Sequence, residues 1–371
     1  MRYRTLGRTG WQVSEIGLGT EYLINKPREH VVSVIREALD QGINYFDLFF
    51  AQPEFRENMG AAFKGRRQDA YLVAHLGSID EDGQYTKTRD PEVAEGFILD
   101  FLKRYETDYI DLLMLHCIDT QDDYDTSFAP GGLADKAKEL KAKGLVRAIG
   151  FSGHTVPTSK QAIESGFVDV LMFPINLAGH GIEGQRELFQ MCEARNIGLV
   201  AMKVFAGGKL FIEGAMKLEM WHTGTGDMTM ERPQGFSAIK AMAYTLLQPG
   251  LSTIVPGCAN LDELSTDLAY LDAGDEEKDY ASLLGAFEHT VEGECVYCNH
   301  CLPCPSVIDI GLVNRLLDTA RIGMTEDLQA RYDAMDSLAS DCIQCASCES
   351  ECPFGVAVID RMEQAVEMFE S

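Results

Sequence analysis

Residues 108–117, which read DYIDLLMLHC, form a nearly continuous apolar run. Such a run is typical of a strand that is buried on both faces, as in parallel sheets covered by helices. Seven more runs of this kind lie at residues 15–19, 44–50, 70–77, 146–153, 168–176, 197–205 and 251–258. Eight such strands predict an α/β fold in which a parallel sheet closes into a (β/α)8 TIM barrel.

Helical patterns separate the apolar runs. In residues 27–42 apolar side chains recur at helical spacing, and Gly42 supplies a C-terminal stop. The apolar positions of this helix are Val31, Val34, Ile35 and Leu39. An open doubly wound sheet is the alternative to a barrel, but no G-x-G-x-x-G motif follows the first apolar run. The closed barrel is therefore favoured.

Two stretches interrupt this alternation. Residues 206–233 form a long insert after the seventh apolar run, and a loop of that length is more typical of a lid or binding segment than of a connector. The alternative is a pair of small extra helices. Residues 273–290 are acidic and are predicted to form a solvated helical bridge to the C-terminal part of the chain.

Eight of the 11 cysteines fall into two groups near the C-terminal end. The first group reads CVYCNHCLPCP and the second CIQCASCESECP, so each contains the C-x2-C-x2-C spacing and a later Cys-Pro pair. Three thiolates at this spacing bind one iron–sulfur cluster, and the cysteine before proline binds the other cluster. The pattern resembles a bacterial two-cluster ferredoxin module, although the first group ends C-x2-C-P instead of C-x3-C-P. Four-cysteine zinc sites are the alternative.

The spacing predicts two [4Fe-4S] clusters with crossed ligands. One would be bound by Cys295, Cys298, Cys301 and Cys352, and the other by Cys342, Cys345, Cys348 and Cys304. The chain is thus predicted to have a barrel domain at residues 1–280 and a small, mainly α-helical, ferredoxin-like iron–sulfur domain at residues 281–371. The other three cysteines, Cys117, Cys192 and Cys258, are expected to be small buried side chains.

The net charge narrows the possible partners. Lys and Arg total 32 against 58 for Asp and Glu, which gives a formal charge of −26. A chain this acidic repels phosphate backbones and anionic lipid, so neither nucleic acid nor a membrane is expected as a partner. The N-terminal residues contain no apolar signal segment, and the longest apolar stretch carries Lys203. We therefore expect a cytoplasmic protein with reduced cysteines.

Several segments of the barrel region are similar to the aldo-keto reductases. They are MRYRTLGRTGWQVSEIGLGT at residues 1–20, GINYFD at 42–47, TDYIDLLMLH at 107–116 and IVPGCANLDELSTDL at 254–268. The chain as a whole resembles a branch of that family with a C-terminal two-cluster module. This resemblance implies carbonyl reduction at the C-terminal ends of the barrel strands, by an Asp, a Tyr, a Lys and a His acting with a nicotinamide cofactor.

Two members of that catalytic set differ in this chain. Asp47 and His116 match the Asp and the His, but Gln52 occupies the Tyr position and His75 the Lys position. A Gln amide cannot release a proton near neutral pH, so it provides only hydrogen bonds. His75, facing Asp47, is a candidate acid or base. Alternatively, Asp47 and His75 are only a hydrogen-bonded pair that closes the mouth of the barrel.

The expected cofactor groove also departs from the family. The resemblance assigns cofactor contacts to Ser152, Gly153, Met172, Pro256, Gly257 and Asp267. Asp267 replaces an Asn of the family, and a carboxylate there opposes a 2′-phosphate and favours a plain ribose. NADPH is therefore less expected than the family implies, and NADH, a flavin or no dinucleotide remain open. His154 and His180 follow barrel strands and are expected at the same mouth, where a metal is a further alternative.

The leading hypothesis is an oxidoreductase that acts on a small organic carbonyl or alcohol, with the clusters transferring electrons to or from it. A ferredoxin or a dehydrogenase is a possible redox partner. Two alternatives stay open. The barrel could have lost catalysis and serve as an electron-transfer or scaffolding subunit, or the His and Asp residues could run a redox-neutral lyase or isomerase reaction.

Overall fold

The computed structural model describes residues 1–211, 215–218, 228–231, 234–284, 293, 295, 301–352 and 355–371. Eight parallel strands form one sheet, and each of the eight apolar runs contributes one of them. In spatial order they are β3 (Leu18–Gly19), β4 (Tyr45–Asp47), β5 (Tyr71–Leu76), β8 (Ile110–Leu115), β9 (Val146–Ser152), β10 (Val170–Pro174), β11 (Gly198–Met202) and β14 (Leu251–Ile254).

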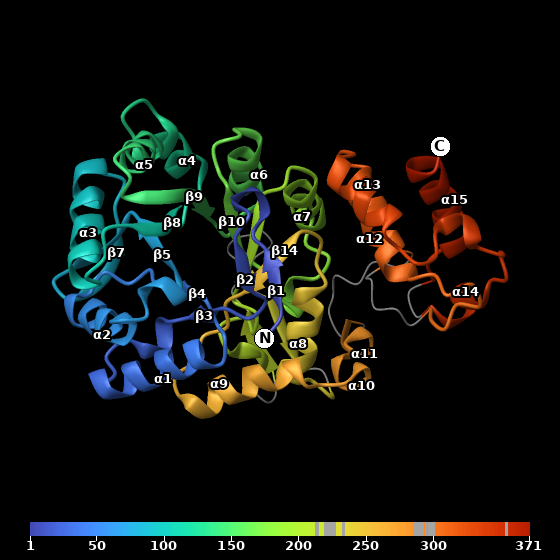
Figure 1. The fold of residues 1–371 in the computed structure, drawn as a ribbon, viewed down its shortest axis with the longest axis horizontal. Helices are drawn as coiled ribbons and strands as arrows, with labels where there is room; N and C mark the ends of the chain where they lie inside the picture. Colours follow the sequence, from blue (N-terminus) through green and yellow to red (C-terminus); the bar gives the residue numbers. More distant parts are fainter. Residues whose placement is uncertain are drawn as a thin grey trace.

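The sheet closes on itself between its first and last strands. Parallel bridges pair Ile16 with Ile254 and Gly19 with Gly257, and the Gly17 amide donates to the Ile254 carbonyl at 2.8 Å. The predicted (β/α)8 barrel is therefore confirmed, and Figure 1 shows it with helices around its outside.

Helices follow the strands and bury their apolar faces against the outside of the sheet. They are α1 (Arg28–Asp40), α2 (Pro53–Phe63), α3 (Pro91–Arg104), α4 (Gln121–Phe128), α5 (Leu133–Ala142), α6 (Val156–Glu164), α7 (Gln185–Ala194), α8 (Ala238–Leu246) and α9 (Leu261–Leu268). In α1 the predicted positions Val31, Val34 and Ile35 are fully buried. Burying each such side chain stabilises the fold by about 1.5–3 kcal/mol.

A second apolar cluster fills the inside of the barrel. It joins residues of the inner strand faces, such as Val73, Leu112 and Met172, to Leu6 and Val13 of the N-terminal segment. That segment forms an antiparallel hairpin of β1 (Tyr3–Thr5) and β2 (Gln12–Ser14). The interior is thus a packed core, which leaves the C-terminal ends of the strands as the place for chemistry.

Two further hairpins interrupt the alternation. The first, β6 (Ser78–Glu81) with β7 (Gln84–Lys87), follows β5 directly and turns at Asp82 and Gly83. Both turn residues have positive φ, 52° and 81°, as a two-residue type I′ turn requires. The second, β12 (Ala215–Leu218) with β13 (Met228–Glu231), lies in the long insert. The described part of that insert therefore contains a hairpin and a short 3-10 turn, Lys209–Phe211, where two α-helices were the alternative.

The C-terminal region is helical, as predicted. It contains α10 (Asp275–Lys278), α11 (Ala281–Leu284), α12 (Ile310–Ala320), α13 (Glu326–Asp333), α14 (Ser347–Glu351) and α15 (Val358–Phe369). Tyr332 of α13 stacks on Phe369 of α15 with ring centroids 4.3 Å apart. The domain boundary at residues 280 and 281 stays a prediction. Among the described helices, none is long and apolar enough to cross a membrane.

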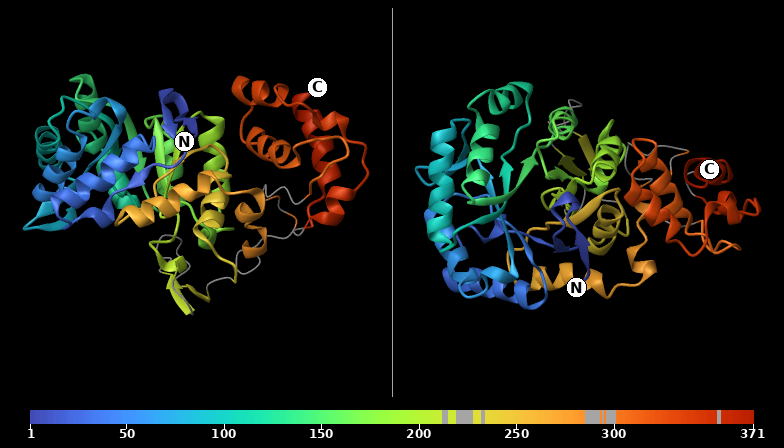
Figure 2. Two further views of the ribbon diagram at one scale, coloured as in Figure 1. Left: turned by 60° about the horizontal axis from the view of Figure 1, so that its bottom comes forward. Right: turned by 45° about the horizontal axis from the view of Figure 1, so that its top comes forward.

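The helical module packs beside α7 of the barrel. Glu193 of α7 accepts a hydrogen bond from Thr319 of α12 at 2.5 Å and pairs with Arg331 of α13 at 2.8 Å. Both views in Figure 2 place the C-terminal helices at one side of the barrel. The cysteine module is therefore attached to the barrel wall by polar contacts as well as by the chain itself.

Candidate active site

Three of the predicted catalytic residues lie at the C-terminal ends of neighbouring strands. Asp47 ends β4, His75 lies in β5 and His116 follows β8, and all three side chains are buried. His75 Nε2 lies 2.7 Å from Asp47 Oδ1, and His75 Nδ1 lies 2.8 Å from His116 Nδ1. The parallel register of β4, β5 and β8 thus brings them into one hydrogen-bonded row.

Tyr85 of β7 extends this row to the surface. Its hydroxyl lies 2.6 Å from His116 Nε2, and the side chain is 38% exposed. Phe49 and Phe50 pack edge-on against the Tyr85 ring, with centroids 5.7 and 5.8 Å away. We call Asp47, His75, His116 and Tyr85 the relay. Tyr85 was not predicted from the sequence, although the Asp82-Gly83 pair is a strong hairpin signal.

The hydrogen bonds of the relay all run in one direction when the His75 and His116 rings are neutral and Asp47 is ionised. Burial, followed by the nearby His75 and Arg89, holds the pKa of His116 well below its usual value, which keeps that ring neutral. Each contact then has one donor only if His75 donates to Asp47, His116 donates to His75, and Tyr85 donates to His116. This proton arrangement is inferred from the hydrogen-bonding pattern.

Gln52 does not join the relay among the contacts of the described residues. It precedes α2, and its Nε2 donates to the carbonyl of Gly83 at 2.7 Å. Gly83 is the turn of the hairpin that carries Tyr85. Gln52 was predicted as a hydrogen-bonding contact at the catalytic centre, and the structure instead places its hydrogen bond on the hairpin.

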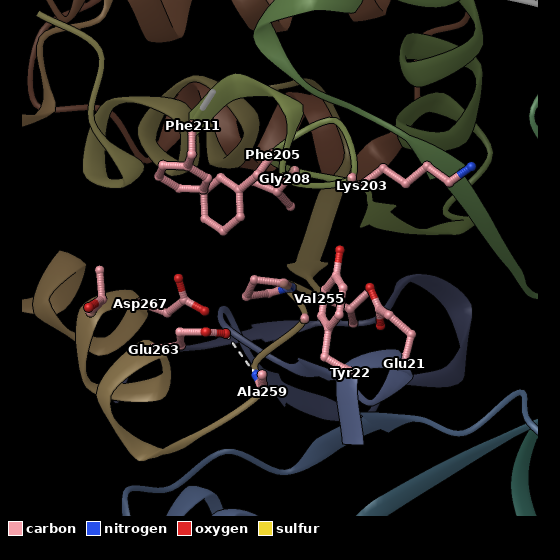
Figure 3. Close-up of a pocket in the computed structure, with 15 residues that line it drawn as sticks. Glu21, Tyr22, Lys203, Phe205, Gly208, Phe211, Val255, Ala259, Glu263 and Asp267 are labelled. Carbon is pink, nitrogen blue, oxygen red and sulfur yellow. Dashed lines mark hydrogen bonds between the residues drawn. The ribbon is translucent and has the colours of Figure 1, made fainter. Parts of the chain in front are cut away.

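A cavity of about 490 Å³ opens beside the relay, between the ends of β3, β11 and β14 (Figure 3). That volume lies within the range of small-molecule and cofactor sites. Its lining includes Pro256, Gly257 and Asp267 of the predicted cofactor residues. Gly207, Gly208 and Phe211 of the long insert line it as well.

The other three predicted cofactor residues do not line this cavity. Met172 is only 1% exposed and packs in the apolar core inside the barrel. Ser152 pairs with it in the sheet, and the Gly153 amide donates to the Met172 carbonyl at 3.3 Å. The expected cofactor residues after β14 therefore line the cavity. Those at the ends of β9 and β10 lie in the barrel wall instead.

Carboxylates dominate the charge of the cavity. Glu21, Glu263 and Asp267 line it, together with Lys203. Burial raises the pKa of Glu21 to about 7, and the neighbouring charge of Asp47 adds to the rise. Burial also raises the pKa of Asp267 to about 7. The cavity has room for part of a dinucleotide, but its charge opposes an extra phosphate, as expected from Asp267.

The Glu21 carboxylate fills the space between two glycines at the barrel closure. A Cβ on Gly19 would lie 2.7 Å from one of its oxygens, and a Cβ on Gly257 would lie 2.6 Å from the other. Only glycine permits this close approach of backbone and carboxylate. Glu21 was not predicted as a site residue, and no local motif around it gives a signal for the role.

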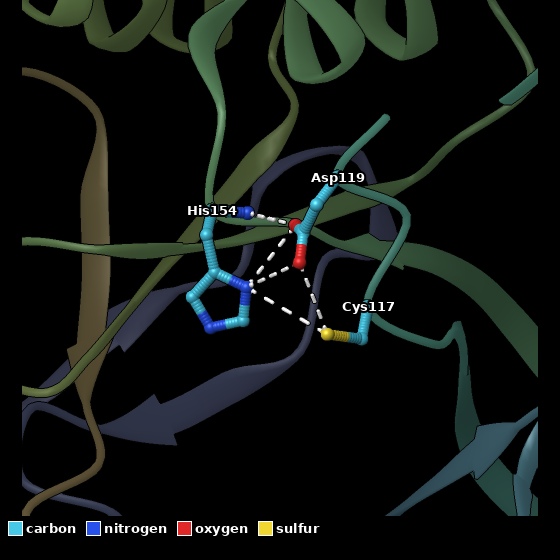
Figure 4. A group of neighbouring side chains, drawn as sticks. All are labelled: Cys117, Asp119 and His154. Atoms are coloured by element: carbon cyan, nitrogen blue, oxygen red, sulfur yellow. Dashed lines mark hydrogen bonds and ion pairs between the residues drawn. The ribbon is translucent and has the colours of Figure 1, made fainter. Parts of the chain in front are cut away.

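His154 and His180 differ in their surroundings. His154 follows β9 and meets Cys117 and Asp119 from the loop after β8 (Figure 4). His180 Nδ1 lies 3.0 Å from the hydroxyl of Tyr244 in α8. Cys117 was expected to be a small buried side chain, but it is partly exposed and hydrogen-bonded at the barrel mouth, so that expectation was wrong. Cys192 and Cys258 are buried as predicted.

The second cysteine group and Cys304 come together in the C-terminal module. A small pocket is lined by Cys304, Cys342, Cys345 and Cys348, with apolar residues such as Ile308 and Met362 around them. Gln344 and Ala346 in the same loop have positive φ, 52° and 60°. Left-handed residues in such a loop turn successive backbone N–H groups towards an anion, and this arrangement is common at iron–sulfur sites. The four thiol groups and this loop conformation are therefore the kind that bind an iron–sulfur cluster.

The remaining predicted ligands are less completely described. Cys295, Cys301 and Cys352 are partly buried, and Cys298 lies outside the described residues. None of the described cysteines forms a disulfide.

The fold and this site define a barrel oxidoreductase with an iron–sulfur module. The model of the aldo/keto reductase family matches residues 15–223, and the chain belongs to that family. A model described as a 4Fe-4S dicluster domain matches residues 294–357. The predicted family, enzyme class and iron–sulfur module are thereby confirmed, and the match supports iron–sulfur clusters over the zinc alternative.

The relatives align with the barrel part of the chain at low sequence identity. An uncharacterized oxidoreductase, YqkF, of Bacillus subtilis is 26% identical over 72% of this chain and 90% of its own length. L-galactose dehydrogenase of Arabidopsis thaliana is 22% identical over 72% of this chain and 86% of its own length. The holo form of aldo-keto reductase AKR11C1 from Bacillus halodurans superposes with a TM-score of 0.61 at 22% identity, over 78% of this chain and 99% of that one.

Proposed function

We propose that this oxidoreductase interconverts a carbonyl and an alcohol on a small organic molecule at the barrel mouth, and that its cysteine module transfers the electrons. The observation that carries the proposal is the relay, in which Tyr85 restores a phenolic hydroxyl that the Gln52 substitution removes. A phenol with a proton path behind it can act as an acid or a base, whereas an amide cannot.

With both rings neutral, the relay favours alcohol oxidation. The Tyr85 hydroxyl donates inward, so its oxygen is available to accept the proton of a substrate hydroxyl. As it does so, its own proton passes to His116, the His116 proton passes to His75, and the His75 proton passes to Asp47. A nicotinamide or flavin, when bound in its oxidised form, would supply the acceptor for the substrate C–H hydrogen and its electron pair.

Adding one proton to the relay reverses the direction of its hydrogen bonds. With Asp47 protonated, as it is after alcohol oxidation, Asp47 donates to His75, His75 donates to His116, and His116 Nε2 donates to the Tyr85 oxygen. The phenolic proton is then free to bond a carbonyl oxygen of the substrate. Carbonyl reduction therefore uses the relay with one more proton than alcohol oxidation does, and it is favoured at lower pH.

The cavity beside the relay is proposed to hold a dinucleotide with an unphosphorylated ribose. Pro256 and Gly257 offer backbone contacts, and Asp267 and Glu263 offer carboxylates of the kind that accept ribose hydroxyls. Ser152, Gly153 and Met172 remain predictions from the family resemblance. A reduced dinucleotide supplies a hydride, and iron–sulfur clusters supply electrons one at a time.

Two clusters are proposed, with the crossed ligand sets predicted from the spacing. The pocket formed by Cys304 with Cys342, Cys345 and Cys348 supports the second set. Cys295, Cys298, Cys301 and Cys352 are proposed for the first. The acidic chain, with a net charge of −26, suits a basic redox partner such as a ferredoxin or dehydrogenase of complementary charge.

The test is turnover of Tyr85→Phe in anaerobically purified protein. Small aldehydes, ketones and sugars serve as substrates, with NADH or reduced viologen as the electron source. We expect turnover to fall by roughly 10²–10⁴-fold, the usual contribution of a positioned proton donor. Tyr3→Phe is the matched control, because Tyr3 is an exposed tyrosine in the N-terminal hairpin. Wild-type turnover of Tyr85→Phe would refute the role of the relay, and turnover without any electron donor or acceptor would favour the redox-neutral alternative.

A further inference from the structure

We infer that Cys117, Asp119 and His154 form a binding site for one divalent cation of the zinc type at the barrel mouth. This inference goes beyond the proposed function, because binding at this site does not depend on the reaction of the relay. It is carried by the geometry of three ligand atoms of different chemistry that converge from two neighbouring strand ends.

The chain positions these three residues from adjacent βα loops. Cys117 and Asp119 lie between β8 and α4, and His154 follows β9. The Asp119 carboxylate is oriented by the backbone amide of His154, which donates to Oδ1 at 2.7 Å. Thr155 Oγ1 donates to the Asp119 carbonyl at 2.9 Å. Such outer contacts are what fixes ligand orientation in metal sites.

Cys117 has a strained backbone that other side chains maintain. Its φ is 53°, a left-handed conformation that a residue with a Cβ rarely adopts. Arg89 donates to the carbonyl of Cys117 at 2.8 Å and to that of His116 at 3.0 Å, which holds the loop in this shape. Strain of this kind is concentrated at functional sites. Here it directs the sulfur towards Asp119 and His154.

The distances match those that a tetrahedral ion imposes. Cys117 Sγ lies 3.2 Å from Asp119 Oδ2 and 3.8 Å from His154 Nδ1, and His154 Nδ1 lies 3.1 Å from both Asp119 oxygens. A zinc ion at usual bond lengths and tetrahedral angles holds sulfur, nitrogen and oxygen ligands about 3.3–3.6 Å apart. Shifts of a few tenths of an ångström would therefore complete the site.

The charges of the group also suit a cation. Burial alone raises the pKa of Asp119, but hydrogen bonds from His154 and Cys117 outweigh it and hold that pKa well below its usual range. Burial lowers the pKa of His154, so its ring is neutral, and coordination through Nδ1 uses the tautomer that carries the proton on Nε2. Cys117 must lose its thiol proton, and each bound ion therefore releases one proton to solvent. Lys87 Nζ, 3.7 Å from the sulfur, belongs to an exposed side chain that can turn away.

Three protein ligands leave the fourth position open, as in catalytic zinc sites. Cys117 directly follows His116 of the relay, so an ion held here borders the same mouth as Tyr85. An ion in such a position polarises a carbonyl oxygen or stabilises an alkoxide. The class of ligand expected at its open position is therefore water or an oxygen of the substrate.

The test is zinc titration of the anaerobically purified holoprotein by calorimetry, after removal of loosely bound metal with a chelator and with iron content measured in every sample. Wild type is expected to bind one zinc ion more per chain than Cys117→Ser, Asp119→Asn or His154→Ala, and to release one proton per ion in weak buffer. The controls Cys192→Ala and Asp122→Asn should bind as wild type does. Asp122 is an exposed neighbouring acid and Cys192 is a buried thiol outside the cluster.

Equal zinc stoichiometry in wild type and in the three site variants would overturn the inference, and so would the absence of zinc binding to wild type. Iron content and circular dichroism identify any variant that fails to fold. Since three different variants probe the site, loss of one to misfolding leaves two to decide the outcome. Because the readout is binding, the result is independent of whether Tyr85→Phe changes turnover.

Discussion

The barrel mouth and the cysteine module bring their functional groups together in different ways. In the module, three cysteines within seven residues, Cys342 to Cys348, share a pocket with Cys304. At the mouth, Asp47, His75 and His116 meet because the barrel strands are parallel and in register, and the antiparallel hairpin after β5 adds Tyr85. The module's chemistry is therefore local in the sequence, and that of the mouth is a product of tertiary structure.

The largest expected effect is a loss of iron from the cysteine module, whose ligands are close in the sequence. Cys345→Ala should remove one cluster and lower the iron content by about half, since each cluster of this kind needs its cysteine ligands. Iron and sulfide analysis measures the loss, and Cys192→Ala should keep the wild-type content.

The double variant Cys304→Ala/Cys345→Ala sharpens that test. If both residues bind the same cluster, as the shared pocket suggests, the double variant should lose no more iron than Cys345→Ala alone. Loss of nearly all the iron would place the two cysteines on different clusters and contradict the crossed ligand sets.

The next effect concerns the mouth. His116→Ala should lower turnover by roughly 10²–10⁴-fold at unchanged iron content, because it interrupts the relay between Tyr85 and His75. Steady-state kinetics with the carbonyl panel measures this change. His180→Ala is a suitable control, because His180 contacts the Tyr244 hydroxyl outside the relay and is not among the residues that line the cavity. A variant as active as wild type would leave His116 a purely structural residue.

A smaller effect is expected from Gln52→Ala. Gln52 holds the turn that carries Tyr85, so its loss should loosen the hairpin and lower kcat by about tenfold, with KM changing less. Gln84→Ala, an exposed residue of the same hairpin, is the control. Recovery of activity in Gln52→Asn would oppose this account, because the shorter amide is not expected to reach Gly83.

The smallest effect concerns the cavity and pH. The carboxyls of Glu21 and Asp267, with pKa values raised to about 7 by burial, are protonated below that pH and charged above it. Their charges oppose the extra phosphate of NADPH, so NADPH affinity should weaken relative to NADH affinity as pH rises through 7, and Asp267→Asn should reduce this dependence. Fluorescence titration with NADH and NADPH between pH 6 and pH 8 measures the ratio of the two affinities, and a pH-independent ratio in wild type would contradict the proposed role of these carboxyls.

The sequence predicted most of the fold and three of the four relay residues. The eight apolar runs identified every barrel strand, because burial on both faces leaves a compositional mark. Asp47, His75 and His116 were identified from the family resemblance, at positions that end barrel strands. Tyr85 was missed because it lies on a polar hairpin inserted after β5. This hairpin is outside the alternation of strands and helices, so the alternation does not predict which of its side chains reach the mouth.

The cavity shows a second limit of sequence reasoning. Glu21 lines the cavity because Gly19 and Gly257, which have no Cβ, leave room for its carboxylate where the first and last barrel strands meet. The residues around Glu21 in the sequence do not indicate this contact between the two strands. The Met172 position was chosen by family correspondence, but a residue at the centre of a strand can face the interior core, as Met172 does. Cys117 likewise lies in an apolar segment whose last residues leave the strand.

The most direct test of the relay is a double-mutant cycle of Tyr85→Phe and His75→Asn, with turnover measured anaerobically at constant iron content. If the four residues act as one unit, the double variant should turn over no more slowly than the slower single variant. Independent losses that multiply in the double variant, or a single variant with wild-type turnover, would show that no proton path joins Asp47 to Tyr85.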